Sequence, residues 1–269
     1  MFFKNFKVWE TELAGRKLTL ETGKMAGLAN AAIMARYGET EVLCTVTASA
    51  KPREGVDFFP LSVDYEEKMY AVGKIPGSFL RREGRAGEKA ILTSRCIDRP
   101  IRPLFPKDLR NDCSVVATVM SVDPDCSPEI TAAIGVSAAI AISDIPWDGP
   151  ISSVNVGIVD GEIVINPTLE QRAKTDLTLT VASTADLVAM IEAGGNEIDD
   201  DTMFNAIMAG HEENKKIVKF IQGIVDEVGK PKFAYESSDP DPEIMKEIED
   251  FCIEDVKKAL DTDDKLVRD

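Results

Sequence analysis

The first quarter of the chain contains five short stretches in which apolar and polar side chains alternate. Alternation with a period of two residues is typical of strands, because successive side chains of a strand point to opposite faces. Glycine, proline and polar residues that favour turns separate the stretches. The pattern predicts an antiparallel sheet with one face on a core and the other in water. The predicted strands are residues 6–13, 17–25, 31–38, 40–49 and 61–69.

Three later segments have the spacing of helices, in which apolar residues recur every three or four positions. Residues 87–99 are predicted to form a helix that Pro100 and Pro103 terminate. Residues 128–144 are small and apolar on nearly every side, so we expect their helix to be buried between layers. A long helix is predicted from about residue 199 to residue 228, with three aspartates at its positively polarised end.

Further strands are predicted between and after these helices. Asp160 and Gly161 have the composition of a hairpin turn. Strands and helices are therefore intermixed, and the chain has neither a GxGxxG sequence nor a Walker loop. These features predict an α+β layered domain. The strand-forming segments of this second group are residues 113–123, 151–166, 176–184 and 186–194.

A polar, proline-broken segment at residues 235–243 has the composition of a linker. It separates a predicted core domain, residues 1–235, from an amphipathic helical unit, residues 236–269. We expect the core domain to consist of a strand-rich part, 1–146, and a second strand group with the long helix, 147–231. The helical unit has no second helix to cover its apolar side, so we expect the chain to be a piece of a longer protein.

The composition excludes several kinds of site. His211 is the single histidine of the 269 residues, so a His-based triad or a multi-histidine metal site is excluded within the chain. The five cysteines are widely spaced and form no CxxC pair, which favours buried thiols over zinc ligands. The longest apolar run, around residues 134–142, is too short to span a bilayer. We therefore expect a cytoplasmic protein without a membrane partner.

The charge distribution has one unusual feature, a basic segment within an acidic chain. The formal net charge is −16, yet residues 74–110 contain ten Lys and Arg against four Asp and Glu. This segment is +6, which leaves −22 for the remainder. Guanidinium groups bind phosphate oxygens through paired hydrogen bonds, and an aromatic ring can stack on a base. The segment therefore predicts contacts to single-stranded nucleic acid by Phe79, Arg81, Arg82, Arg85, Arg99 and Arg102.

A plainer interpretation of these arginines stays open. They could be solvated surface groups, or they could pair with Glu83, Glu88 and Asp98 of the same segment. Asp98 in particular could hold an arginine near the end of the predicted helix as a structural ion pair.

Three stretches carry a resemblance to a known family. They are FFPLSVDYEEKMYAVGKIPGSF, RREGRAGEKAILTSRCIDRPIRPLFP and VDPDCSPEITAAIGVSAAIAISDIPWDGP. Together they are similar to the first RNase PH-like domain of bacterial polynucleotide phosphorylases, and the resemblance runs from residue 3 to about residue 231. It implies an RNase PH-like fold with ribosomal-protein-type βαβ layers. The helical tail resembles the start of the all-helical linker domain of that family.

The resemblance implies 3′-to-5′ phosphorolysis of single-stranded RNA in mRNA turnover, with inorganic phosphate as co-substrate and nucleoside diphosphates as products. Mg²⁺ or Mn²⁺ is the implied cofactor of the full-length enzyme. In this family the chemistry belongs to a second RNase PH-like copy, while the first copy helps to form a homotrimeric ring and guides RNA through its channel. We therefore expect this chain to be inactive alone and to hold no cofactor.

The resemblance also assigns the candidate contacts to two places. Phe79, Arg81 and Arg82 match an RNA-binding loop that faces the channel, and Leu80 stands where the family has a second aromatic residue. The other three arginines match further basic positions of the same region. The two on the helix and its exit could instead serve the interface between the two copies.

Two features of the sequence argue against a complete active site within this chain. The catalytic copy binds phosphate at a serine-rich turn, but here the turn is Cys126-Ser127-Pro128-Glu129, in which Glu129 repels phosphate and Pro128 lacks a backbone donor. Asp176 is the alternative candidate for the catalytic copy's acid/base or metal-binding aspartate, from which it is displaced by two residues. Two other functions stay open: a stand-alone RNA-binding scaffold, and a single-copy RNase PH-type exoribonuclease that uses Asp176.

Overall fold

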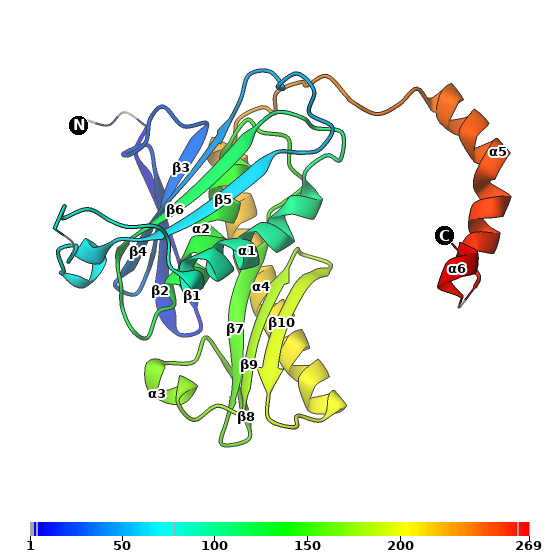
Figure 1. The fold of residues 1–269 in the computed structure, drawn as a ribbon. Coiled ribbons are helices and arrows are strands. Elements are labelled where there is room, and N and C mark those ends of the chain that lie inside the picture. The colour runs from blue at the N-terminus through cyan, green and yellow to red at the C-terminus, as the bar shows by residue number, and fades with distance from the viewer. Residues whose placement is uncertain (1–2, 4, 78, 263, 269) are drawn as a thin grey trace. The chain divides into compact units, whose positions relative to one another are not determined.

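The structure is a computed structural model that describes residues 3, 5–77, 79–262 and 264–268. The chain divides into two compact units, Met1–Tyr235 and Glu236–Asp269. All of the described strands belong to the first unit, and the second is helical (Figure 1).

The N-terminal strands form a six-stranded sheet with the order β1-β2-β3-β4-β6-β5. Neighbours are antiparallel except β5 and β6, which run parallel. Buried and half-buried residues alternate along β3, β4 and β6, as expected when one face of a sheet covers the core. The strands are β1 (Lys7–Leu13), β2 (Arg16–Thr22), β3 (Ala31–Tyr37), β4 (Thr40–Ala48), β5 (Leu61–Glu67) and β6 (Cys113–Ser121).

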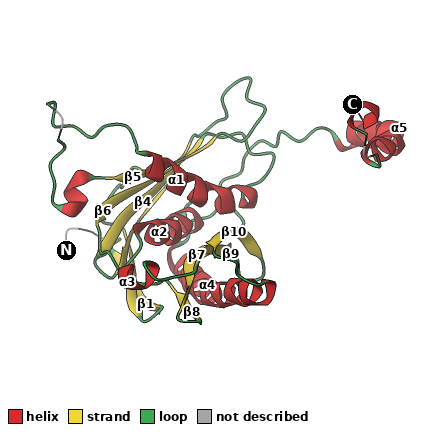
Figure 2. Cartoon of the chain, turned by 60° about the horizontal axis from the view of Figure 1, so that its bottom comes forward, coloured by secondary structure: helices red, strands yellow, loops and turns green. Residues whose placement is uncertain are grey.

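Helix α2 (Pro128–Ile142) covers the inner face of this sheet, and the prediction of a buried helix is confirmed. Figure 2 shows α2 between the six-stranded sheet on one side and β7 and α4 on the other. At Gly135 this helix lies close to the sheet. A Cβ atom added there would lie 2.6 Å from Cys44 Sγ on β4 and 2.9 Å from Ala35 Cβ on β3. The missing side chain therefore lets α2 lie close to both strands.

A second sheet has four antiparallel strands in the order β10-β9-β7-β8. Helix α4 (Asp200–Val228) packs against β7, β9 and α2, and Asn214 Nδ2 on α4 donates to the Val181 carbonyl oxygen at 2.9 Å. The α+β prediction is thus confirmed, with α2 as the element that both sheets share. The remaining elements of this part are β7 (Ser152–Val159), β8 (Glu162–Ile165), α3 (Leu169–Arg172), β9 (Leu177–Ser183) and β10 (Val188–Gly195).

The connection from β5 to β6 carries the basic segment. It consists of a short 3₁₀ helix η1 (Met69–Val72), an exposed loop, α1 (Glu88–Ile101) and a second 3₁₀ helix η2 (Arg102–Leu104). We predicted that Pro100 would terminate α1, but the helix continues to Ile101 and Pro100 is buried in its last turn. A proline removes a backbone donor and crowds the preceding turn. Burial of the Ile101 side chain, and a hydrogen bond of 3.0 Å from Trp147 Nε1 to its carbonyl oxygen, keep this turn helical.

The second unit consists of α5 (Pro242–Leu260) and α6 (Lys265–Arg268). Asp241 caps α5, because its Oδ1 accepts a hydrogen bond of 2.8 Å from the Glu243 backbone N–H. Apolar side chains of α5, among them Ile248 and Phe251, are exposed. Within the described ranges, no helix has both the length and the apolar character that crossing a membrane requires.

Candidate nucleic-acid interface

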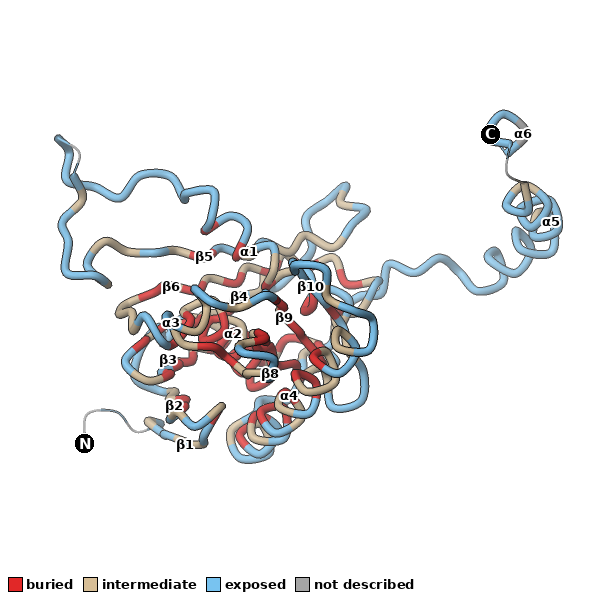
Figure 3. The backbone as a smooth tube through the Cα atoms, turned by 90° about the horizontal axis from the view of Figure 1, so that it is seen from below, coloured by how far each residue is buried: buried red, intermediate tan, exposed pale blue. Residues whose placement is uncertain are grey.

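The loop between η1 and α1 is exposed at every described residue from 79 to 87. We call its described tip, residues 79–87, the arginine loop, and Figure 3 shows the chain between β5 and α1 as an extended, exposed segment. The Phe79 side chain is 99% exposed and Leu80 is 70% exposed. Arg81 has a φ angle of 51°, in the left-handed region that non-glycine residues rarely adopt, so the chain turns at this position.

Three arginines of this loop are free of carboxylate partners. Arg81, Arg82 and Arg85 are exposed, and none of them makes an ion pair or side-chain hydrogen bond with any residue that the structure describes. Glu83, the acid within the loop, forms no ion pair with these arginines among the described residues, and its Oε1 accepts a hydrogen bond of 2.9 Å from the Met69 backbone N–H. Glu83 therefore ties the loop to η1 and leaves its guanidinium groups available.

Arg99 and Arg102 are arranged differently. Arg102 binds both carboxylate oxygens of Asp98, at 3.0 and 2.8 Å, and donates to the Leu61 carbonyl oxygen at 3.1 Å. The structural ion pair that we considered for Asp98 is thus confirmed, with Arg102 as its partner. Arg99 NH1 lies 2.7 Å from Glu192 Oε2 on β10 and links α1 to the second sheet. The structure therefore brings Phe79 together with three free arginines and places the other two candidates against carboxylates.

Two neighbours of the arginine loop were missed as candidates. Arg95 on α1 is exposed and has no ion-pair partner among the described residues. Tyr70 on η1 is 52% exposed beside the Met69 amide that Glu83 holds. The predicted strand 61–69 ended just before Tyr70, and an aromatic residue so close to the basic loop was the signal that could have identified it.

At the N-terminus of α2, the structure shows how the turn Cys126-Ser127-Pro128-Glu129 is used. Ser127 Oγ accepts a hydrogen bond of 3.3 Å from the Ile130 N–H and donates one of 2.6 Å to Glu129 Oε2. Lys89 Nζ on α1 lies 2.7 Å from Glu129 Oε1, a pair that we did not foresee. A carboxylate thus occupies the positive end of α2, beside a cavity of about 610 Å³ that both residues of the pair line. Its negative charge disfavours a phosphate at this position.

The Glu129 carboxylate is held in its charged form. Burial alone would raise its pKa, but the hydrogen bonds from Lys89 and Ser127 outweigh burial and lower the pKa below the usual value of 4.5. A carboxyl group whose pKa is lower in the folded state stabilises the fold above its unfolded pKa, and this stabilisation is lost as the pH falls through the folded-state pKa.

We therefore expect Glu129→Gln to lower the free energy of unfolding by about 1 kcal/mol at neutral pH, because the charged hydrogen bonds are lost. The difference between the two proteins should shrink as the pH falls below 4.5. Urea unfolding at about pH 7 and about pH 3.5 measures it. Glu170→Gln, which removes an exposed pair with Lys174, is the control and should change little. A difference for Glu129→Gln that is equal at both pH values would contradict this account of the pair.

Asp176 stands apart from any cluster of metal-ligating groups. It is exposed immediately before β9, where its backbone N–H donates to the Ile158 carbonyl oxygen at 3.2 Å and its carbonyl oxygen accepts from the Asn196 N–H at 3.0 Å. Across the residues with described positions, no three His, Cys, Asp or Glu side chains come together as a metal site would require.

Comparison with known proteins agrees with this fold. A family model described as 3′ exoribonuclease family, domain 1, matches residues 14–146, and domain 2 of the same family matches residues 149–213. The crystal structure of rice (Oryza sativa) Rrp46 is similar with a TM-score of 0.61 and 15% identity, over 83% of this chain and 95% of that one. At this level of identity, the likeness to rice Rrp46 is one of fold.

Two bacterial relatives are much more similar in sequence. The polyribonucleotide nucleotidyltransferase of Ruminiclostridium cellulolyticum is 60% identical over 264 residues, which cover 98% of this chain and 38% of the relative. That of Caldicellulosiruptor saccharolyticus is 57% identical over 263 residues, again 98% of this chain and 38% of the relative. The chain thus spans well under half the length of these curated relatives. With both domains of the family model matched in order, the chain belongs to the 3′ exoribonuclease family of RNase PH-like proteins.

Proposed function

We propose that this chain is the RNA-holding, non-catalytic RNase PH-like part of a polyribonucleotide nucleotidyltransferase, or polynucleotide phosphorylase. The observation that carries the proposal is the arginine loop, in which three guanidinium groups without a partner among the described residues lie next to a fully exposed aromatic ring. Its relatives of 57–60% identity bear the name polyribonucleotide nucleotidyltransferase. The site of action of such an enzyme in RNA turnover is the cytoplasm.

The arginine loop suits a single strand of RNA. Free guanidinium groups bind phosphate oxygens and release the counterions that the strand carries. A base that stacks on an exposed ring such as Phe79 gains about 1–3 kcal/mol, whatever its sequence. Arg99 and Arg102 already have carboxylate partners, so we assign them to the contact with a second RNase PH-like copy. An exposed ion pair such as Arg99 with Glu192 costs little to rearrange there.

The proposed reaction of the whole enzyme is phosphorolysis at the 3′ end of the RNA. An oxygen of inorganic phosphate bonds to the phosphorus of the terminal phosphodiester, the bond from that phosphorus to the preceding O3′ breaks, and O3′ takes up a proton. The products are a nucleoside diphosphate and an RNA shorter by one nucleotide. Such transfer needs positioning, hydrogen-bond donors and a divalent cation around the phosphorus. Because Glu129 occupies the end of α2, we place this machinery in the second copy, within a trimeric ring.

An assay of binding and turnover on the same chain tests the proposal. We expect the chain to bind oligoadenylate but to release no nucleoside diphosphate when phosphate and Mg²⁺ are added. A protein extended by a second RNase PH-like segment should bind and also turn over. Release by this chain alone would contradict the proposal, and loss of that release in Asp176→Asn would identify a single-copy exoribonuclease. Binding without turnover in the extended protein would instead favour a scaffold.

A further inference from the structure

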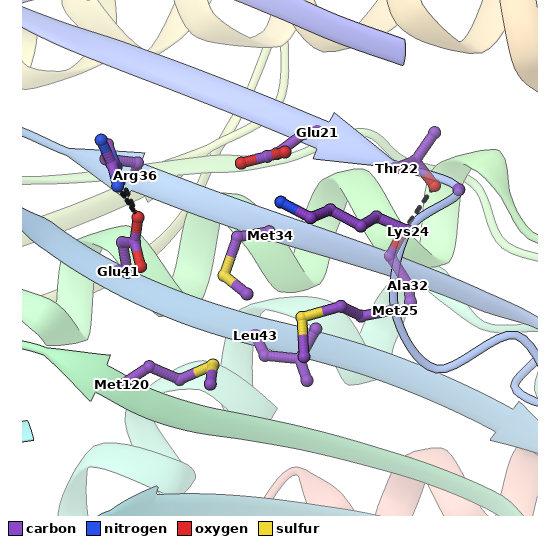
Figure 4. Close-up of a pocket in the computed structure, with 11 residues that line it drawn as sticks. Glu21, Thr22, Lys24, Met25, Ala32, Met34, Arg36, Glu41, Leu43 and Met120 are labelled. Carbon is purple, nitrogen blue, oxygen red and sulfur yellow. Dashed lines mark hydrogen bonds and ion pairs between the residues drawn. The ribbon is translucent and has the colours of Figure 1, made fainter. Parts of the chain in front are cut away.

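The outer face of the six-stranded sheet carries a cavity with an apolar floor. Met34 on β3 and Leu43 on β4 are cross-strand partners, and both are half-buried on the face turned away from α2. Met120 joins them because a β-bulge separates the pairs Glu41–Ser121 and Val42–Val119, which leaves Met120 as the extra residue of β6. Figure 4 shows these three side chains and Met25 among the residues that line the cavity. The volume of the cavity is about 260 Å³.

Charged groups surround this floor. Glu21, Lys24, Arg36 and Glu41 line the same cavity, and Arg36 and Glu41 form an ion pair with each other (Figure 4). Lys24 has no carboxylate partner in the described part of the chain, and its ammonium lies 5.7 Å from the centre of the Phe6 ring. The cavity therefore offers an apolar surface with hydrogen-bond donors and acceptors at its edge.

A second cavity, of about 660 Å³, adjoins the first. The two share Thr22, Gly23, Lys24, Met25 and Ala32, so the start of the β2–β3 loop lines both cavities. The second cavity is lined by Lys7, Lys24 and Lys230, and no acid is among its described lining residues, although the chain is strongly acidic. Lys7 also pairs with Glu227, and the Lys230 ammonium donates to the Asn30 carbonyl oxygen. These lysines make the second cavity a site for negative charge.

We infer that the two cavities together bind a purine nucleotide, with the base on the methionine floor and the phosphates among the lysines. Thioether side chains pack favourably against aromatic rings and adapt to their shape. Carboxylates at the edge, such as Glu21, accept hydrogen bonds from amino groups of a base. Lysine ammonium groups bind phosphate as point charges. The second cavity alone, at about 660 Å³, falls in the range of about 300–1,000 Å³ that small-molecule sites occupy.

The backbone of the β2–β3 loop fits this role. Gly23 has a φ angle of 82°, and an added Cβ atom would lie 2.0 Å from the Asn5 carbonyl oxygen, so glycine alone fits there. This turn carries Lys24 and Met25 to the boundary of both cavities. Lys24 is therefore the residue that would touch the nucleotide at the point where base and phosphate meet.

Calorimetric titration of the 269-residue chain with ADP, adenosine and pyrophosphate tests this site. We expect ADP to bind at least about tenfold more tightly than adenosine or pyrophosphate alone. Lys24→Ala should weaken ADP about tenfold and leave adenosine unchanged. Met34→Gln, which keeps the side-chain volume, should weaken both ADP and adenosine. Lys51→Ala, at an exposed lysine elsewhere, and the pair Arg81→Ala with Arg82→Ala should leave ADP binding unchanged.

Four results would overturn the inference. They are no measurable ADP binding, pyrophosphate binding as tight as ADP, equal losses for Lys24→Ala and Lys51→Ala, and loss of ADP binding when Arg81 and Arg82 are replaced. The last result would move the ligand to the arginine loop. Oligoadenylate added to the variant with Arg81→Ala and Arg82→Ala shows whether the natural ligand of the cavities is the end of an RNA or a free nucleotide. Displacement of ADP assigns the site to the end of an RNA, and no displacement assigns it to the free nucleotide.

Discussion

Replacing Arg81 and Arg82 together with alanine is expected to weaken the binding of oligoadenylate about 10- to 100-fold at low salt. Both side chains are exposed and lack partners among the described residues, so their loss removes phosphate contacts without breaking any internal bond. Each phosphate contact to a single strand contributes about 0.7 to the slope of log affinity against log salt. Two lost contacts should therefore reduce that slope by about 1.4. The unfolding midpoint should not change.

Fluorescence anisotropy with a labelled oligoadenylate at several salt concentrations measures both quantities. Lys257→Ala with Lys258→Ala is a matched control, because it removes the same charge from exposed positions of α5 in the other compact unit. The control should alter neither affinity nor slope appreciably. If the arginine variant binds as tightly as the original chain but loses its self-association, the loop is an assembly contact and the proposed RNA interface is wrong.

The elements that depend on local pattern were predictable from the sequence. Alternation in residues 31–38 and 40–49 identified β3 and β4, and the small-residue segment identified α2 as a buried helix. The prediction of an antiparallel sheet was wrong for β5, which runs parallel to β6, because strand direction depends on how the chain returns through α1. Helix α3 was also missed, although Thr168 and Gln171 form a capping box that the sequence displays.

The candidate site was predictable where composition alone defines it. The arginine loop is basic, glycine-flanked and followed by a helix, and each of these properties is local. The partner of Arg99 was not predictable, because Glu192 lies 93 residues away and meets it only when β10 approaches α1. The same holds for Lys89 and Glu129, which belong to different helices. The sequence therefore identifies the candidate basic residues, but only the fold shows which of them have a carboxylate partner.

Replacing Gly135 with alanine is expected to lower the free energy of unfolding by about 2–3 kcal/mol, even though alanine favours helices by about 1 kcal/mol over glycine. The added Cβ would stand 2.6 Å from Cys44 Sγ and 2.9 Å from Ala35 Cβ. Both neighbours are fully buried, and Ala35 has no rotatable side chain with which to move away. To relieve these close contacts, α2 must shift away from β3 and β4, and this shift loosens the core that both sheets share.

Urea unfolding followed by circular dichroism measures this effect, and Gly223→Ala on α4 is its matched control. An added Cβ at Gly223 meets nothing within 4 Å, so the same substitution should stabilise the protein by up to about 1 kcal/mol. The larger Gly135→Val should broaden or abolish the cooperative transition, since a branched side chain deepens the same clash. A Gly135→Ala protein as stable as the original would contradict this account. It would mean that α2 can move away from the sheet at little cost, so that the close packing at Gly135 does not fix the position of α2 on β3 and β4.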